Sequence, residues 1–85
     1  MTVALRPLDD LLVDGDRCAV MIDAHVVVLS ELATTIVLAL RESPASVDTL
    51  SEVLVTAYGD PGDALTLTRT AVDDLAAHGI VEVAE

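Results

Sequence analysis

The side chains in this sequence that are best suited to binding a transition metal are Cys18, His25 and His78. Zinc sites usually draw such ligands from closely spaced pairs, as in C-x-x-C or H-x-x-x-H, and the chain contains no pair of this kind. We therefore expect no metal site. Cys18 is expected in the apolar core, His25 at the end of a strand, and His78 near a helix C-terminus, where the helix dipole favours positive charge.

Acid–base or nucleophilic catalysis is the other chemistry to consider. Asp9–Asp10 and Asp73–Asp74 are adjacent carboxylate pairs. Neighbouring residues on a helix do not face each other, so the second pair is poorly placed to share a proton, and a solvated acidic surface is expected instead. No nucleophile elbow surrounds the serines, and no glycine-rich phosphate loop occurs. We therefore expect a protein that is not an enzyme and that uses no cofactor.

Length and charge restrict the partners. The 85 residues suffice for a single small domain, residues 1–85, and the net charge is −11 because fifteen acidic residues face four arginines and no lysine. This balance argues against nucleic acid and against a membrane surface, because binding to either depends on basic side chains. No apolar run approaches the roughly 20 residues of a membrane span, and no signal peptide is evident. With its single cysteine, the chain is expected to be cytoplasmic.

Short apolar runs in the first third of the chain predict strands. They cover residues 11–13, 18–22 and 25–29, and the turns between them are Asp14-Gly15-Asp16 and Asp23-Ala24. We expect an antiparallel meander of three strands. The third run is apolar at four successive positions, Val26 to Leu29, whereas a strand with one buried face should alternate. Either both faces of this strand are covered, or one face is left exposed.

The rest of the chain has helical spacing. Ser30 is expected to cap a first helix that ends near Glu42, before Ser43-Pro44. A second helix is expected after Ser46 or Asp48 and should end at Gly59. Its predicted inner stripe follows the i, i+3, i+4 rule and consists of Leu50, Val53, Leu54, Ala57 and Tyr58.

A third helix is expected from Ala64 or Thr66 to His78, with Gly79 ending it. Residues 2–7 are expected to be extended or frayed, and residues 80–83 to form an extended tail or a last strand. Together these elements predict a small α+β domain of the winged-helix kind, in which a three-stranded antiparallel sheet is followed by three helices.

Three segments resemble a known family. They are VVVLSELATTIVLAL, with a strand that turns into an alanine-rich helix; SVDTLSEVLVTAYGD, a middle helix; and TRTAVDDLAAHGIVEV, a closing helix with a Gly-Ile exit. The chain thus resembles the PqqD-like family, the RiPP recognition elements that bind leader peptides in the biosynthesis of ribosomally made natural products. Ser30 stands where asparagine is commoner in that family, and it can act as the same N-cap.

The resemblance implies a function and a site. Such elements bind the leader segment of a precursor peptide as an added strand on the third strand of the meander, beside the third helix, and deliver it to a separate peptidase, cyclase or radical enzyme. Lasso peptides are one candidate pathway. Carried onto this sequence, the peptide-binding residues are Val26, Val27, Val28, Leu29, Arg69, Val72, Asp73 and Ala76.

Other functions remain open at this point. A winged-helix transcriptional regulator would need basic residues on its recognition helix, and the second and third expected helices hold only Arg69. An acidic carrier protein would need a serine that opens a helix in an Asp-Ser-Leu type of context, and none occurs. A different protein–protein adaptor is a further alternative. Arg69 itself is either part of a surface ion pair or a contact for an acidic group of a partner.

Overall fold

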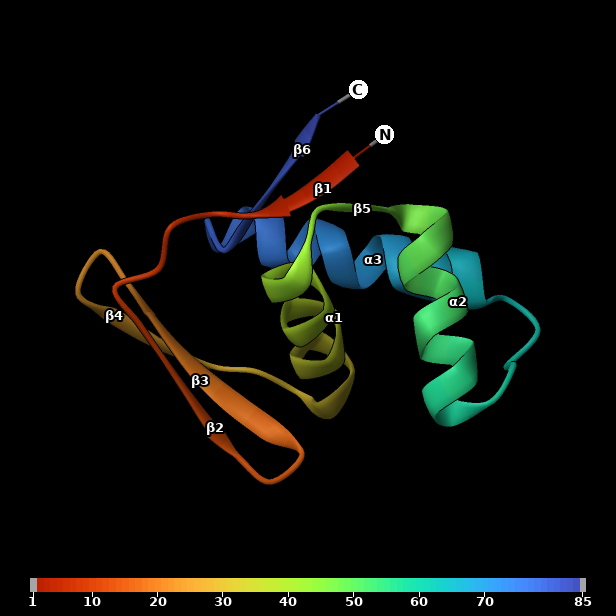
Figure 1. Ribbon diagram of the computed structural model, residues 1–85, viewed down its shortest axis with the longest axis horizontal. Helices are drawn as coiled ribbons and strands as arrows, with labels where there is room; N and C mark the ends of the chain where they lie inside the picture. The colour runs from red at the N-terminus through yellow and green to blue at the C-terminus, as the bar shows by residue number, and fades with distance from the viewer. Residues whose placement is uncertain (1, 85) are drawn as a thin grey trace.

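The computed structural model describes residues 2–84 of the chain (Figure 1). It contains two three-stranded antiparallel sheets and three helices. In chain order the elements are β1 (Thr2–Leu5), β2 (Asp10–Asp14), β3 (Arg17–Ile22), β4 (His25–Val28), α1 (Glu31–Glu42), β5 (Ala45–Ser46), α2 (Val47–Tyr58), α3 (Ala64–Ala77) and β6 (Val81–Ala84). The predicted α+β class is confirmed. The prediction of a single sheet is wrong.

The predicted meander is the sheet of β2, β3 and β4, in that spatial order. Its hairpins close through two-residue loops, because Asp14 pairs with Arg17 and Ile22 pairs with His25. Gly15 in the first loop has φ 62°, as glycine readily allows. The second loop has no glycine, and Asp23 and Ala24 adopt φ of 51° and 66°.

The second sheet joins the two ends of the chain to its middle. β1 lies between β5 and β6, and it pairs with β6 along its whole length, from Thr2 opposite Ala84 to Leu5 opposite Val81. Residues 2–5 are therefore a central strand and are not frayed, and Val3 is fully buried. This sheet was not predicted because its strands come from distant parts of the chain, and no local pattern shows which of them pair.

The helix boundaries follow local chemistry, as predicted. The Ser30 hydroxyl accepts a hydrogen bond from the Ala33 amide at 3.2 Å, and the Ser46 hydroxyl accepts one from the Thr49 amide at 3.1 Å. Ser46, and not Asp48, is thus the cap of α2. α1 ends at Glu42, two residues before Pro44, and α2 ends at Tyr58 with Gly59 as its C-cap.

The end of α3 is a Schellman motif. The Gly79 amide donates to the Ala76 carbonyl, and the Ile80 amide donates to the Leu75 carbonyl, both at 3.0 Å. This geometry needs a left-handed residue, and Gly79 has φ 76°. The motif turns the chain directly into β6, so that Ile80 and Val81 enter the core.

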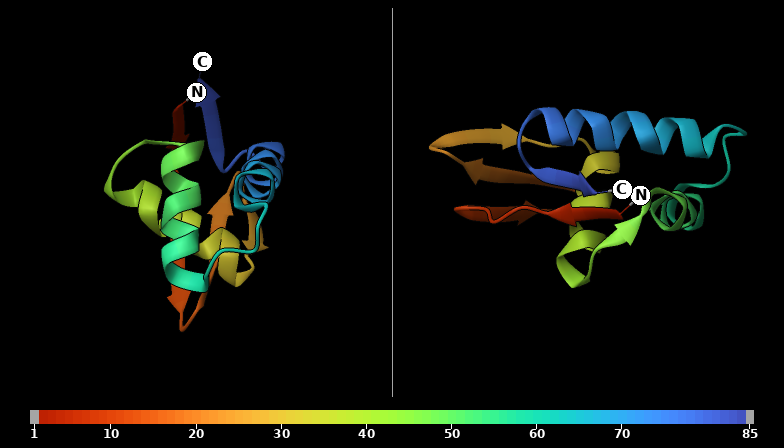
Figure 2. Two further views of the ribbon diagram at one scale, coloured as in Figure 1. Left: turned by 90° about the vertical axis from the view of Figure 1, so that its right-hand side faces the viewer. Right: turned by 90° about the horizontal axis from the view of Figure 1, so that it is seen from above.

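The core lies where α1 meets the other helices and both sheets. Figures 1 and 2 show α1 in the middle of the molecule, with the meander on one side and α2 on the other, while α3 runs along the body. The buried stripe of α2 begins earlier than predicted, with Val47, Leu50, Ser51 and Leu54. Tyr58, which the predicted stripe included, is 52% exposed.

We predict that Leu54→Ala destabilises the domain. The Leu54 side chain is 6% exposed within the core, and large-to-small changes at such positions cost about 2–5 kcal/mol of unfolding free energy. Leu65→Ala on α3 is the matched control, because Leu65 is 44% exposed and surface changes usually cost only about 0.5 kcal/mol. Chemical denaturation measures both changes. Equal stability losses for the two variants would contradict the burial of Leu54.

Candidate functional site

β4 is an edge strand of the meander. It pairs with β3 on one side, and no strand among residues 2–84 pairs with its other side. The Leu29 amide donates to the Cys18 carbonyl at 2.8 Å, so the backbone polar groups of Leu29 face β3. Because backbone direction alternates along an antiparallel strand, those of His25 and Val27 also face β3. The N–H and C=O groups of Val26 and Val28 therefore point to the free edge.

The side chains of β4 alternate as well. Val27 is half-buried and packs against the core, whereas Val26 and Val28 are 62% and 65% exposed. This settles the question raised by the apolar run: one face of the strand is left exposed. Leu29, which follows β4, returns to the core at 5% exposure.

Side-chain hydrogen bonds end the pairing of β3 and β4. After Leu29 the chain turns into α1, and the Cys18 amide no longer has a backbone acceptor opposite it. The Thr34 hydroxyl of α1 accepts its hydrogen bond instead, at 3.0 Å. The Leu29 carbonyl accepts from Nε of Arg17 at 3.2 Å. These bonds fix the position at which the strand stops and the helix begins.

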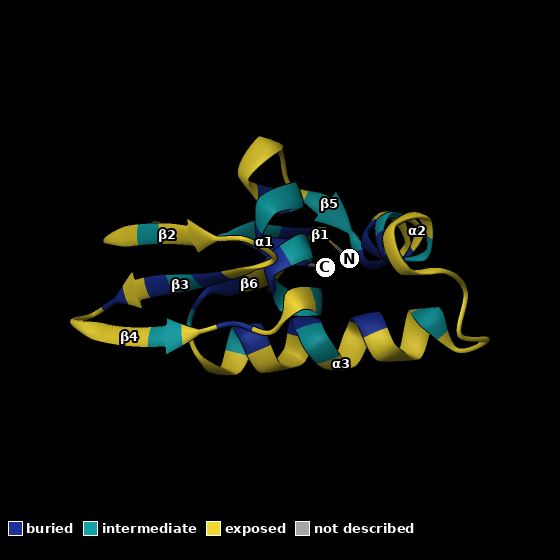
Figure 3. Cartoon of the chain, turned by 90° about the horizontal axis from the view of Figure 1, so that it is seen from below, coloured by how far each residue is buried: buried dark blue, intermediate teal, exposed yellow. Residues whose placement is uncertain are grey.

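The predicted residues on α3 differ in exposure. Arg69 and Asp73 are exposed, Ala76 is half-buried, and Val72 is 1% exposed within the core. β4 and α3 lie on the same side of the molecule (Figure 3), although α3 packs mainly against α2, α1 and β6. Val72 is therefore a core residue of α3 and is not accessible to a bound peptide. Its substitution would test folding more than binding.

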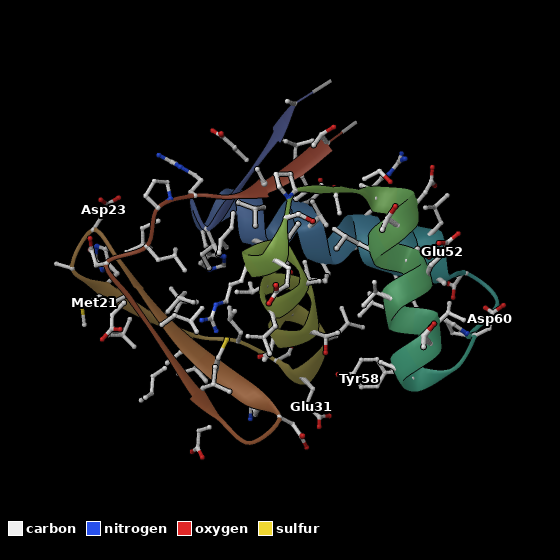
Figure 4. The ribbon with its side chains drawn as sticks, in the orientation of Figure 1. Met21, Asp23, Glu31, Glu52, Tyr58 and Asp60 are labelled. Carbon is white, nitrogen blue, oxygen red and sulfur yellow. The ribbon has the colours of Figure 1, made fainter. Side chains whose placement is uncertain are left out.

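A cleft of about 300 Å³ lies away from β4, between the three helices. Leu32 of α1, Leu54 of α2 and Leu67 of α3 line it, together with the loop that follows α2. Beside it, the Tyr58 hydroxyl donates to the Glu31 carbonyl at 3.2 Å, which ties the end of α2 to the start of α1 (Figure 4). The lining is largely aliphatic, and its polar side chains are those of Tyr58, Asp60 and Thr68.

The meander has an exposed apolar surface, of which the sequence analysis raised only the part on residues 26–29. We call it the outer face; it consists of Leu12, Ala19, Met21, Val26 and Val28. A hollow of about 190 Å³ lies on it. The available signal was the unbroken apolar run of residues 18–22: Cys18, Val20 and Ile22 are buried, so Ala19 and Met21 are left on the other face.

Within residues 2–84, no cluster of three or more His, Cys, Asp or Glu side chains could hold a metal ion. No helix in this part of the chain has the length and apolar character needed to cross a membrane. Comparisons with protein-family models, with curated proteins and with solved structures found no match. The function must therefore be inferred from the free edge, the exposed side chains and the charge.

We predict that Thr34→Val destabilises the junction between β4 and α1. Valine has nearly the same shape but cannot accept the hydrogen bond of the Cys18 amide, and an unsatisfied buried donor costs about 1–3 kcal/mol. Thr70→Val is the control, because Thr70 is exposed and bonds only within its own helix. Denaturant titration compares the two, and hydrogen exchange should show faster exchange at Cys18 only in Thr34→Val. A variant as stable as the wild type would show that the hydroxyl is dispensable.

We predict that Ala24→Gly stabilises the β3–β4 hairpin. Ala24 adopts φ 66°, and a left-handed conformation costs an L-residue about 1–2 kcal/mol. Glycine avoids that cost but loses more chain entropy on folding, so the net gain should be about 0.5–1 kcal/mol. Ala4→Gly, in the middle of β1, should instead destabilise by about the same amount. Thermal unfolding of the two variants should move in opposite directions, and a lower melting temperature for Ala24→Gly would refute the prediction.

Proposed function

We propose that this chain binds the leader segment of a ribosomally made precursor peptide as an antiparallel strand added to β4. The bound precursor would then be delivered to a separate peptidase, cyclase or radical enzyme. The observation that carries the proposal is the free edge of β4, where the N–H and C=O groups of Val26 and Val28 have no strand partner among residues 2–84. The resemblance to PqqD-like RiPP recognition elements supports the same site.

Strand addition draws its affinity from the main chain. Each of Val26 and Val28 offers one donor and one acceptor at the edge, and each hydrogen bond contributes about 0.5–1.5 kcal/mol net. Side chains then supply specificity through alternate positions of the bound strand. Leader residues that face the same way as Val26 and Val28 would lie beside exposed aliphatic side chains. We therefore expect apolar leader residues at every second position there.

The residues between those positions would point toward the side on which α3 lies. Arg69 and Asp73 are exposed on this helix and are the partners that we propose for charged leader side chains. Val27 of β4 and Ala76 of α3 are half-buried. Leu29, which follows β4, and Val72 of α3 are buried in the core and anchor the two elements there. The net charge of −11 favours leaders that are neutral or basic overall.

The proposal also covers the fold class of the domain and the cellular compartment in which it works. We propose that the meander and the three helices form a winged-helix-like unit, that the chain acts without a cofactor or catalysis of its own, and that it works in the cytoplasm beside its partner enzyme. Lasso-peptide biosynthesis is one pathway of this kind. A short precursor gene beside a peptidase, cyclase or radical-enzyme gene would identify the leader to be tested.

We predict that Val28→Pro weakens leader binding about tenfold or more without unfolding the domain. Proline removes the Val28 amide donor, which points to the free edge, so no bond to β3 is lost. Val28→Thr is the matched control, because it keeps the amide and the β-branched shape, and it should bind within a few-fold of wild type. Isothermal titration with the leader encoded beside this gene measures both affinities.

Amide chemical-shift mapping locates the bound leader in the same experiment. We expect the largest changes at Val26 and Val28 and in the neighbouring residues of β3. A folded Val28→Pro variant that binds as tightly as wild type, with shifts confined to α2, would refute strand addition to β4. Val27→Pro is unsuitable for this test, because the Val27 amide faces Val20 within the sheet.

A further inference from the structure

The outer face of the meander is an apolar surface on a sheet whose opposite side already packs on the core. Leu12, Ala19 and Val28 lie across the three strands in one row, and Met21 and Val26 lie side by side in the next. Leu12 is 69% exposed, more than either exposed valine of β4. An antiparallel sheet with one solvated face normally carries polar residues there. A contiguous apolar patch with a polar rim marks an interaction site.

The rim of this patch is acidic. Residues 9–28 contain five aspartates, all of them exposed, and Arg17 is the only arginine or lysine among them. Asp10 and Asp14 alternate with Leu12 along β2, and Asp23 lies with Met21 toward the outer end of the meander (Figure 4). With a net charge of −11 on each chain, a second copy would be repelled, whereas a basic partner would be attracted.

The dimensions of the outer face favour a helix as its occupant. Strands in a sheet lie about 4.8 Å apart, so the distance from β2 to β4 across β3 is about 10 Å. An α-helix with its side chains is about 10–12 Å in diameter. A single helix would thus cover the face, and packing a helix on a sheet is a standard way to bury an apolar sheet face.

We propose that the outer face docks an amphipathic helix of a partner protein, with an aliphatic stripe against the five outer-face residues and lysine or arginine on both sides of that stripe. This interaction differs from the proposed leader binding, although Val26 and Val28 take part in both. It uses side chains on all three strands, including Leu12 and Met21, which are not on the β4 edge. Strand addition uses the backbone of β4.

The test uses a synthetic amphipathic helix as the probe. A peptide of about 18 residues, with leucines at helical a and d spacing and lysines beside them, is titrated into the isotope-labelled chain. A scrambled peptide of the same composition is the control for general attraction to the acidic chain. We expect amide and methyl shifts centred on Leu12, Met21 and Val26, and at least about tenfold weaker binding of the scrambled peptide.

Matched variants separate the outer face from other exposed apolar positions. Leu12→Thr with Met21→Thr keeps strand propensity and removes apolar surface, and it should weaken binding about tenfold. Leu65→Gln with Leu67→Gln removes exposed leucines from α3 instead and should leave binding unchanged. The Val28→Pro variant keeps four of the five outer-face residues, Leu12, Ala19, Met21 and Val26, and its titration with the leader is scored separately from the titration with the helical peptide.

Three outcomes would overturn the proposal. Equal binding of the scrambled peptide would show charge attraction only. Shifts centred on the cleft between the helices, lost in the Leu65→Gln, Leu67→Gln variant, would place the binding site there. Self-association of the chain that disappears in Leu12→Thr, Met21→Thr would identify a second copy as the occupant. Selective binding on the outer face, lost only in that variant, would support the proposal.

Discussion

The hydrogen bond between the Thr34 hydroxyl and the Cys18 amide is the buried polar contact that joins the meander to α1. Antiparallel pairing of β3 with β4 would place a backbone acceptor opposite Cys18, but the chain has already turned toward α1 at that point. A side chain from the helix supplies the acceptor instead. Both groups are buried, and an unsatisfied donor there would be costly, so the meander and α1 hold one relative position.

The surfaces beside that junction remain open. The chain leaves the sheet after Leu29, and no later strand among residues 2–84 pairs with the free edge of β4. The free edge and the outer face therefore remain available together. An exposed edge with apolar side chains invites association with other chains, and strong negative charge is one way to limit it. Both proposals treat these features as binding surfaces, one through the backbone of β4 and the other through side chains of all three strands.

The second sheet serves a different purpose from the meander. β1 and β6 bring the two ends of the described chain together; β1 contacts α1, β6 contacts α3, and Val3, Ile80 and Val81 are buried. The part of the domain formed by the second sheet and the helices is thus stabilised by residues far from the candidate site. The meander projects from this part, as Figure 1 shows, so substitutions on its outer face leave the core contacts in place. This separation makes binding and stability independently measurable.

The sequence by itself determined the features that depend on neighbouring residues. Ser30 and Ser46 cap helices, Pro44 limits α1, Gly79 ends α3, and Gly15 forms a hairpin loop, because each acts on the backbone within a few residues of itself. The tertiary structure alone decided that residues 2–5 form a central strand and that Val26 and Val28 are exposed. These outcomes depend on pairing and packing between segments far apart in the chain, which local patterns do not encode.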